Sequence, residues 1–240
     1  MPPPPLILYT FAPSPFGLKA ATALKYKKAS FQTRHVHLVS QKEIRFTGQK
    51  TIPVLRAGDA WKVGSGDICR WLERLIPEPS FGGRNAAEDA AILEADNWVS
   101  DVLIALVRRS WIDKRESAAA HRNNRRIVKL LRKTSKGVPP LAEWYWLFLT
   151  RSTPFIQRQA ALLDPKTPIA ELYRNVVAQF DRKLAASGFL AGGEALSYAD
   201  IAAFAQVAFA SEQGMEHQVH RGSSPAIGDW FERIAAKLPD

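Results

Sequence analysis

Hydrophobic and polar positions follow two different periods in the first third of this 240-residue chain. Apolar runs with β-branched or aromatic residues predict short strands, and apolar positions spaced three or four residues apart predict helices. On this basis we expect strands at 6–11, 31–39, 52–57 and 61–63, and helices at 16–28 and 65–75. The opening order of strand, helix and strand predicts a parallel βαβ unit.

From residue 86 onward the pattern is helical throughout. We expect helices at about 86–109, 116–133, 141–150, 169–184, 198–211 and 225–237. Ser197 and Asp200 have the spacing of a capping box at the start of the fifth of these helices. Proline, glycine and serine gather just before this region, which predicts a linker at 77–85. The predicted fold class is therefore α/β, with a first domain at 1–76 and an all-α helical bundle domain at 86–240.

Positive charge is concentrated in one segment. The formal net charge is +10, and residues 108–136 hold eleven Lys or Arg against two acidic residues. The rest of the chain is close to neutral, so we do not expect a nucleic-acid-binding protein. The segment 108–136 is either a solvated face over a buried apolar stripe or a surface for a peripheral membrane contact or an acidic partner.

Cysteine and histidine usage narrows the chemistry further. The single cysteine, Cys69, excludes an internal disulfide framework and is expected to be a small core residue. The five histidines are not spaced so that a third ligand would join any two of them, so no metal site is expected. The N-terminus has no basic region followed by a long apolar run, and no stretch approaches the roughly 20 apolar residues of a spanning helix. We therefore expect a cytoplasmic protein.

Three short motifs carry the candidate chemistry: Ser14–Gly17, Thr47–Leu55 and Gly64–Asp67. The first and third each open a predicted helix, whose N-terminus carries unpaired amides and partial positive charge. With the run Phe189–Ile201 in the helical part, they resemble the glutathione S-transferase family. A disulfide reductase of similar shape would have cysteine in the first motif. Serine stands there instead, and a hydroxyl cannot replace the thiolate of disulfide exchange.

The resemblance implies a thioredoxin-like first domain, a helical second domain and glutathione as co-substrate. It further implies a transferase that conjugates glutathione to a small hydrophobic electrophile, a role in detoxification and assembly as a homodimer. By the same resemblance, the residue before a cis-proline pairs its backbone with glutathione, which here means Ile52 and Pro53. Ser65 and Asp67 would hold the γ-glutamyl end of the tripeptide.

Other site residues follow from the resemblance more loosely. Gln49 and Lys42 are candidates for the glycine carboxylate of glutathione. Ser14 would stabilise the glutathione thiolate, because a hydroxyl donor at a helix N-terminus lowers the pKa of a thiol. Tyr9 is the second candidate for that role. Three aromatic residues are expected to line the pocket for the hydrophobic substrate: Phe16, Trp111 and Trp144.

A second class of function stays open at this point. The same fold serves non-catalytic binding and scaffolding proteins, and fold alone does not fix function. Gly64 stands where the family usually has an acidic residue, and the basic segment 108–136 offers a surface for a partner. The alternative is therefore a glutathione-binding or scaffolding protein without turnover.

Overall fold

The first part of the chain folds around one mixed four-stranded sheet. The computed structural model describes residues 5–37, 40–134, 138 and 141–239, without the side chains of Glu116 and Trp144. The strands are β1 (Leu6–Thr10), β2 (Phe31–His35), β3 (Val54–Ala57) and β4 (Ala60–Val63). They lie in the order β2-β1-β3-β4, with β1 parallel to β2 and antiparallel to β3. Helices α1 (Pro15–Tyr26) and α2 (Ser65–Leu75) pack against this sheet, and a 3-10 helix η1 (Lys42–Thr47) precedes β3.

The start of α1 illustrates how local sequence sets the geometry. Ser14 is the N-cap, and its side-chain oxygen accepts a hydrogen bond from the Gly17 amide at 3.2 Å. Pro15 follows in the first helical position, where a missing N–H costs nothing. Gly17 is required by close approach, because a Cβ at this position would collide with Oγ1 of Thr10. The turn between β1 and α1 is thereby held close to the end of the strand.

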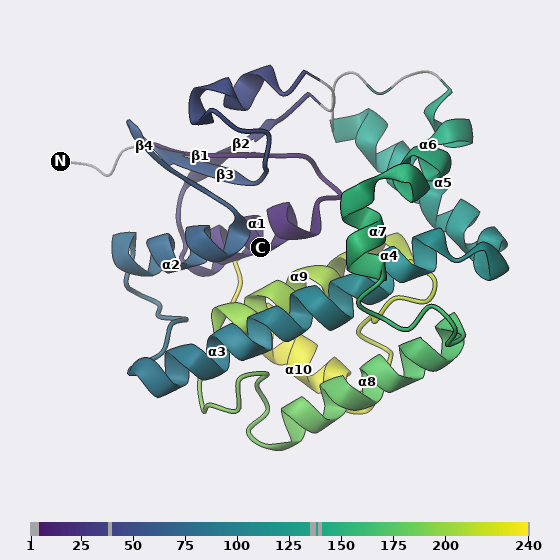
Figure 1. Cartoon of the computed structure of the whole chain (residues 1–240). Coiled ribbons are helices and arrows are strands. Elements are labelled where there is room, and N and C mark those ends of the chain that lie inside the picture. The colour runs from purple at the N-terminus through teal and green to yellow at the C-terminus, as the bar shows by residue number, and fades with distance from the viewer. Residues whose placement is uncertain (1–4, 38–39, 135–137, 139–140, 240) are drawn as a thin grey trace.

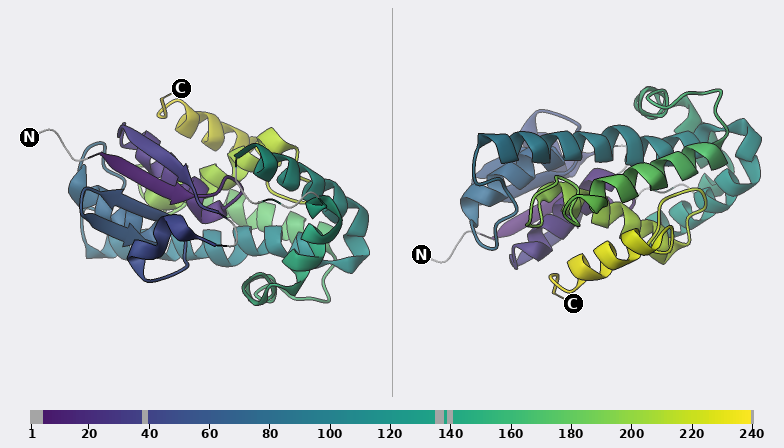
Figure 2. Two further views of the ribbon diagram at one scale, coloured as in Figure 1. Left: turned by 90° about the horizontal axis from the view of Figure 1, so that it is seen from above. Right: turned by 90° about the horizontal axis from the view of Figure 1, so that it is seen from below.

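The second part of the chain is a bundle of helices (Figure 1). Its first helix is continuous and consists of α3 (Ala86–Trp98), a π-helical turn η2 (Val99–Leu103) and α4 (Ile104–Ile112). The remaining helices are η3 (Lys114–Glu116), α5 (Ser117–Thr134), α6 (Ala142–Ser152), α7 (Pro154–Ala160), α8 (Ile169–Ala185), α9 (Tyr198–Gln213) and α10 (Pro225–Ala235). Figure 2 shows the sheet gathered at one end of the molecule, with α3 and α8 extending away from it.

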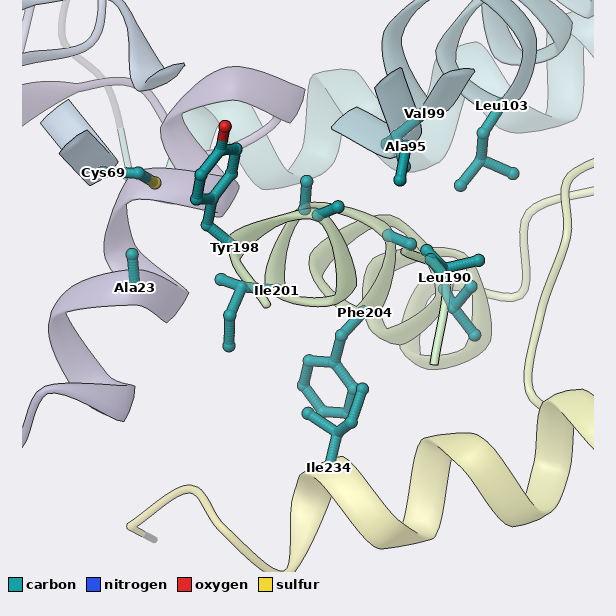
Figure 3. Close-up of a cluster of buried hydrophobic side chains, with 14 of the residues drawn as sticks. Ala23, Cys69, Ala95, Val99, Leu103, Leu190, Tyr198, Ile201, Phe204 and Ile234 are labelled. Carbon is teal, nitrogen blue, oxygen red and sulfur yellow. The ribbon is translucent and has the colours of Figure 1, made fainter. Parts of the chain in front are cut away.

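Helix α9 joins the two parts of the chain. It packs against α1, α3 and α10, and eleven of its sixteen residues are buried. Figure 3 shows Tyr198 directed to the side on which Cys69 lies, whereas Phe204 is directed to Ile234 of α10. The Gln206 side chain donates a hydrogen bond to the carbonyl of Pro15 at 3.1 Å. The helical bundle therefore fixes the N-terminal turn of α1.

A buried ion pair crosses the same interface. Lys19 of α1 and Asp96 of α3 form this pair. The Nζ atom of Lys19 lies 2.5 and 2.6 Å from the two carboxylate oxygens of Asp96. Both side chains are at most 10% exposed. At the start of α9, the buried carboxylate of Asp200 accepts hydrogen bonds from the Ser197 amide and hydroxyl, the Leu190 amide and the Trp230 indole.

The predicted fold class is confirmed, including the parallel βαβ start and the helical second part. The strand expected at 31–39 ends at His35, and residues 38 and 39 lie outside the described part of the chain. Three elements were not predicted: η1, the 3-10 turn η3 and the short helix α7. The division of the chain at 77–85 stays a prediction.

Candidate functional site

A cavity of about 630 Å³ lies between the two parts of the chain. On one side it is bounded by the N-termini of α1 and α2 and by the segment that leads into β3. On the other side it is bounded by α4, α5, α6 and α7. Its walls are mainly apolar. The lining residues discussed below are Ser14, Phe16, Lys50, Ile52, Gly64, Ser65, Arg108, Trp111, Ile127, Trp146, Thr150, Thr153, Phe155 and Ile156.

Ser14 lies in this cavity wall at the N-terminus of α1 and is 5% exposed. Its oxygen already accepts the capping hydrogen bond from Gly17. The hydroxyl hydrogen is not used by that bond, because a serine hydroxyl is a donor as well as an acceptor. Ser14 can therefore cap the helix and donate to a ligand atom at once.

The N-terminus of α2 forms a second polar point in the wall. Its N-cap is Gly64, which has a φ of 86° and no side chain to accept from the first-turn amides. The Gly64 amide donates to the carbonyl of Pro53 at 2.9 Å, which ties α2 to the segment before β3. The peptide bond between Ile52 and Pro53 is cis. The Ser65 hydroxyl has no hydrogen-bond partner in the part of the chain that the structure describes, and Ser65 is buried against the cavity.

An uncapped helix start next to an unpartnered hydroxyl is a site for an anion. The first-turn amides of α2 are among the groups that a helix leaves unpaired, and they carry its positive dipole end. A ligand carboxylate fits this position better than a cation does. The wall contributed by the first 76 residues thus offers two helix N-termini and two serine hydroxyls to one ligand.

Four other predicted residues lie elsewhere. Tyr9 is buried on the opposite face of the sheet, where its ring packs against Phe46 with centroids 5.4 Å apart. Asp67 is exposed in the first turn of α2 and pairs with Arg70 at 2.7 Å. Gln49 and Lys42 are exposed, and neither lines the cavity.

The apolar wall includes two of the three predicted aromatic residues. Phe16 lies at the start of α1, and its ring is 6.4 Å from that of Phe155 on α7, so the two parts of the chain meet at this point. Trp111 lines the cavity from α4. Trp144 lies in α6 but its side chain is outside what the structure describes, and Trp146 of the same helix lines the cavity instead.

Comparison with family models decides the assignment. The glutathione S-transferase N-terminal domain model matches residues 8–80, and the C-terminal domain model matches residues 168–237. The chain belongs to the glutathione S-transferase family. Among curated proteins, none matches the chain.

Solved structures share this fold over nearly the whole chain. The β-etherase LigF from Sphingobium sp. strain SYK-6 is 23% identical and has a TM-score of 0.61 over 96% of this chain and 95% of that chain. A glutathione S-transferase from Rhodospirillum rubrum F11 is 20% identical with a TM-score of 0.62, over 96% and 88%. A maleylacetoacetate isomerase from Anaeromyxobacter dehalogenans 2CP-1, crystallised with dicarboxyethyl glutathione and citrate in its active site, is 17% identical with a TM-score of 0.55, over 98% and 91%. At these identities the likeness concerns the fold alone.

Two charged cavity residues of this glutathione S-transferase family member were not found from its sequence. Lys50 lies beside the predicted Gln49, and its position in the wall follows from the turn into β3. Arg108 was counted only as part of the basic segment 108–136. The structure buries it in the cavity wall, where it is 7% exposed. A run of basic residues gives no signal of which member is buried.

Most arginines of the basic segment have local partners. Arg122 and Arg126 both pair with Glu216, and Arg132 pairs with Glu143. Such exposed pairs contribute little to stability, but they reduce the positive charge that a partner would meet. Three basic residues on α5 are exposed without an ion pair to the described residues: Arg125, Lys129 and Lys133. The surface available to an acidic partner is therefore smaller than the sequence count implies.

The remaining predicted features are structural. Cys69 is fully buried, and this burial raises the pKa of its thiol to about 11. No cluster of three or more potential metal ligands occurs among the described residues. Within the same ranges, no helix is both long and apolar enough to cross a membrane.

Proposed function

We propose that this protein is a glutathione transferase that joins the thiol of glutathione to a hydrophobic electrophile, with Ser14 as the group that stabilises the thiolate. The proposal is supported above all by two walls that meet in one cavity. One wall holds two helix N-termini with serine hydroxyls, and the other wall carries aromatic side chains. Membership of the glutathione S-transferase family supports glutathione as the co-substrate.

The tripeptide is assigned to the wall from the first domain. Its γ-glutamyl carboxylate would accept hydrogen bonds from the Ser65 hydroxyl and the first-turn amides of α2. Its cysteinyl backbone would pair with the backbone of Ile52, and Lys50 would face the glycine carboxylate. Asp67 is assigned no contact with glutathione, because it already pairs with Arg70.

The thiol would then lie near Ser14. A thiol loses its proton more readily when the resulting anion accepts a hydrogen bond and lies at the positive end of a helix. The thiolate sulfur attacks the electrophilic carbon and forms a C–S bond, while the leaving group departs with its bonding electron pair. The thiol proton goes to solvent. Phe16, Trp111 and Phe155 would hold the apolar part of the electrophile.

The family resemblance adds a homodimer and a role in detoxification to the proposal, and the sequence adds a cytoplasmic location. The competing function is a glutathione-binding or scaffolding protein without turnover. It differs from the transferase in one measurable respect, since it binds glutathione at the same cavity and leaves electrophiles unchanged.

The experiment measures glutathione affinity by calorimetry and conjugation rates with aromatic electrophiles. We expect saturable glutathione binding that Ser65→Ala weakens. We expect Ser14→Ala to lower kcat/KM by roughly 10- to 100-fold, because it removes one hydrogen bond to a charged group. Its glutathione affinity should change little.

Ser224 provides a matched control. It is also the N-cap of a helix that begins Ser-Pro, and its side chain accepts from the Ile227 amide at the same 3.2 Å. Ser224→Ala removes the same kind of cap, worth about 1 kcal/mol, together with a hydrogen bond from the Ser224 hydroxyl to Asp181 at 2.6 Å, far along the chain from the cavity. Equal losses of activity in both variants would mean that Ser14 acts only through stability. Binding without turnover would select the non-catalytic alternative, and no binding at millimolar glutathione would refute both.

A further inference from the structure

Arg108 is a buried cation in the apolar wall of the cavity. It lies on α4, 7% exposed, and its guanidinium carbon is 4.7 Å from the centre of the Trp111 ring. Burial lowers the pKa of Arg108 to about 10, so the group still carries its charge at neutral pH. An aromatic face attracts a guanidinium, but this attraction does not replace the hydration that the charge has lost.

No carboxylate compensates this charge in the part of the chain that the structure describes. The only hydrogen bond of the Arg108 side chain there is a long one of 3.4 Å from Nε to the amide oxygen of Gln159. The neighbouring Arg109 gives the contrast, since it is equally buried and pairs with Asp113 at 3.0 Å. Buried arginines are normally paired in this way, because an unpaired buried charge is costly.

The described residues that line the cavity with Arg108 are basic or neutral. The lining residues contributed by α5, α6, α7 and the residue between α6 and α7 are all uncharged: Ile127, Trp146, Thr150, Thr153, Phe155 and Ile156. The described lining of the whole cavity contains Arg108 and Lys50 and no acidic residue. A neutral hydrophobic electrophile would leave the Arg108 charge as uncompensated as it is without a ligand.

We propose that the electrophile carries a carboxylate, which pairs with the guanidinium of Arg108 while its apolar part lies against the aromatic wall. This inference rests on the proposed function. The planar guanidinium presents parallel N–H donors that match the two oxygens of a carboxylate. The carboxylates of glutathione are assigned to the facing wall, at the N-terminus of α2 and at Lys50, so Arg108 is left for the second substrate.

The test compares two ligands that differ in one group, which is a carboxylate in the first and a neutral carboxamide of similar shape in the second. S-(4-carboxy-2-nitrophenyl)glutathione and its 4-carbamoyl analogue share the tripeptide and the ring. We expect the carboxylate ligand to bind roughly 10- to 100-fold more tightly by calorimetry, as a hydrogen-bonded charge pair contributes. Arg108→Met should abolish this preference, and Arg108→Lys should retain part of it. Arg125→Met removes the same charge from the exposed face of α5 and should leave the preference unchanged.

Two further readouts separate a ligand-binding role from a structural one. Because Arg108 is unpaired, Arg108→Met should keep or raise the melting temperature, whereas a structural arginine would lower it. The second readout is turnover of 4-chloro-3-nitrobenzoate and of 4-chloro-3-nitrobenzamide, with each rate divided by its uncatalysed rate with glutathione. We expect the same preference for the carboxylate compound. In both reactions the sulfur bonds to the ring carbon and chloride leaves with the C–Cl electron pair.

The outcomes distinguish this inference from the proposed function. A carboxylate preference in binding, without turnover of either chlorinated compound, would support the anion site and refute the transferase. Turnover of both compounds with equal affinity for the two conjugates would refute the anion site and support the transferase. Absence of binding by either conjugate would overturn the inference.

Discussion

The ion pair between Lys19 and Asp96 should be the strongest single link between the two parts of the chain. Its two N–O distances are 2.5 and 2.6 Å, and both side chains are at most 10% exposed. Asp96→Leu leaves the Lys19 ammonium buried, and among the described residues the face of the Tyr198 ring, 5.3 Å away, is then left to attract it. Lys19→Met leaves the carboxylate buried instead. Each change therefore strands one charge in a nearly dry interface.

The expected magnitude follows from that stranded charge. Removing one partner of a buried pair typically costs about 3–5 kcal/mol. For a chain of this size that corresponds to a fall of about 6–20 °C in Tm. The double variant Lys19→Met, Asp96→Leu strands no charge and fills the same volume with apolar groups. Its free energy of unfolding should return to within about 1 kcal/mol of the unchanged protein.

Urea unfolding, followed by circular dichroism and by tryptophan fluorescence, measures these differences. The coupling free energy from the double-mutant cycle should be about 3 kcal/mol or more. Additive single effects would contradict the argument, because they would mean that the two groups do not depend on each other. A free energy of unfolding within about 1 kcal/mol of that of the unchanged protein in each single variant would also contradict the argument.

Three other predictions concern single positions. Gly17→Ala should lower the free energy of unfolding by about 1–3 kcal/mol, since its Cβ collides with Thr10 Oγ1. Adding Thr10→Ala should restore part of that loss in the same urea assay. Cys69, with a pKa raised to about 11, should react with a thiol reagent at pH 8 only as fast as the protein unfolds, and a rapid native reaction would refute its burial. Asp200→Ala should lower the free energy of unfolding by about 3–5 kcal/mol, because it leaves the buried donors of Leu190 and Trp230 unpaired. A decrease below about 1 kcal/mol would contradict this prediction.

The fold could be predicted largely from local signals in the sequence. Ser14-Pro15 marked the start of α1, and Ser197 with Asp200 marked the start of α9, because capping chemistry is local. The short helix α7 was missed, since Pro154–Ala160 spans only two turns and has little periodicity to detect. Its place depends on packing against α4, which the sequence does not state.

The candidate site could be predicted only in part, for a physical reason. Ser14 and Ser65 were found because their motifs resemble those of the family and each motif opens a helix, and both line the cavity. Tyr9 lies on the other face of the sheet because successive side chains of a strand alternate, and Leu8 and Thr10 take the opposite side. Arg108 was not singled out, since whether an arginine is paired or unpaired depends on residues brought near it by folding.

The contact between α1 and α9 has a consequence for synthesis of the chain. Helix α1 ends at Tyr26, whereas the helix that covers its outer side ends at Gln213. At about 5–20 residues per second, the ribosome needs roughly 10–40 s to add the intervening segment. During that time the newly made α1 presents Lys19 without Asp96 at first, and its apolar side without α9 throughout. We therefore expect the nascent chain to be a client of chaperones until almost its entire length has emerged.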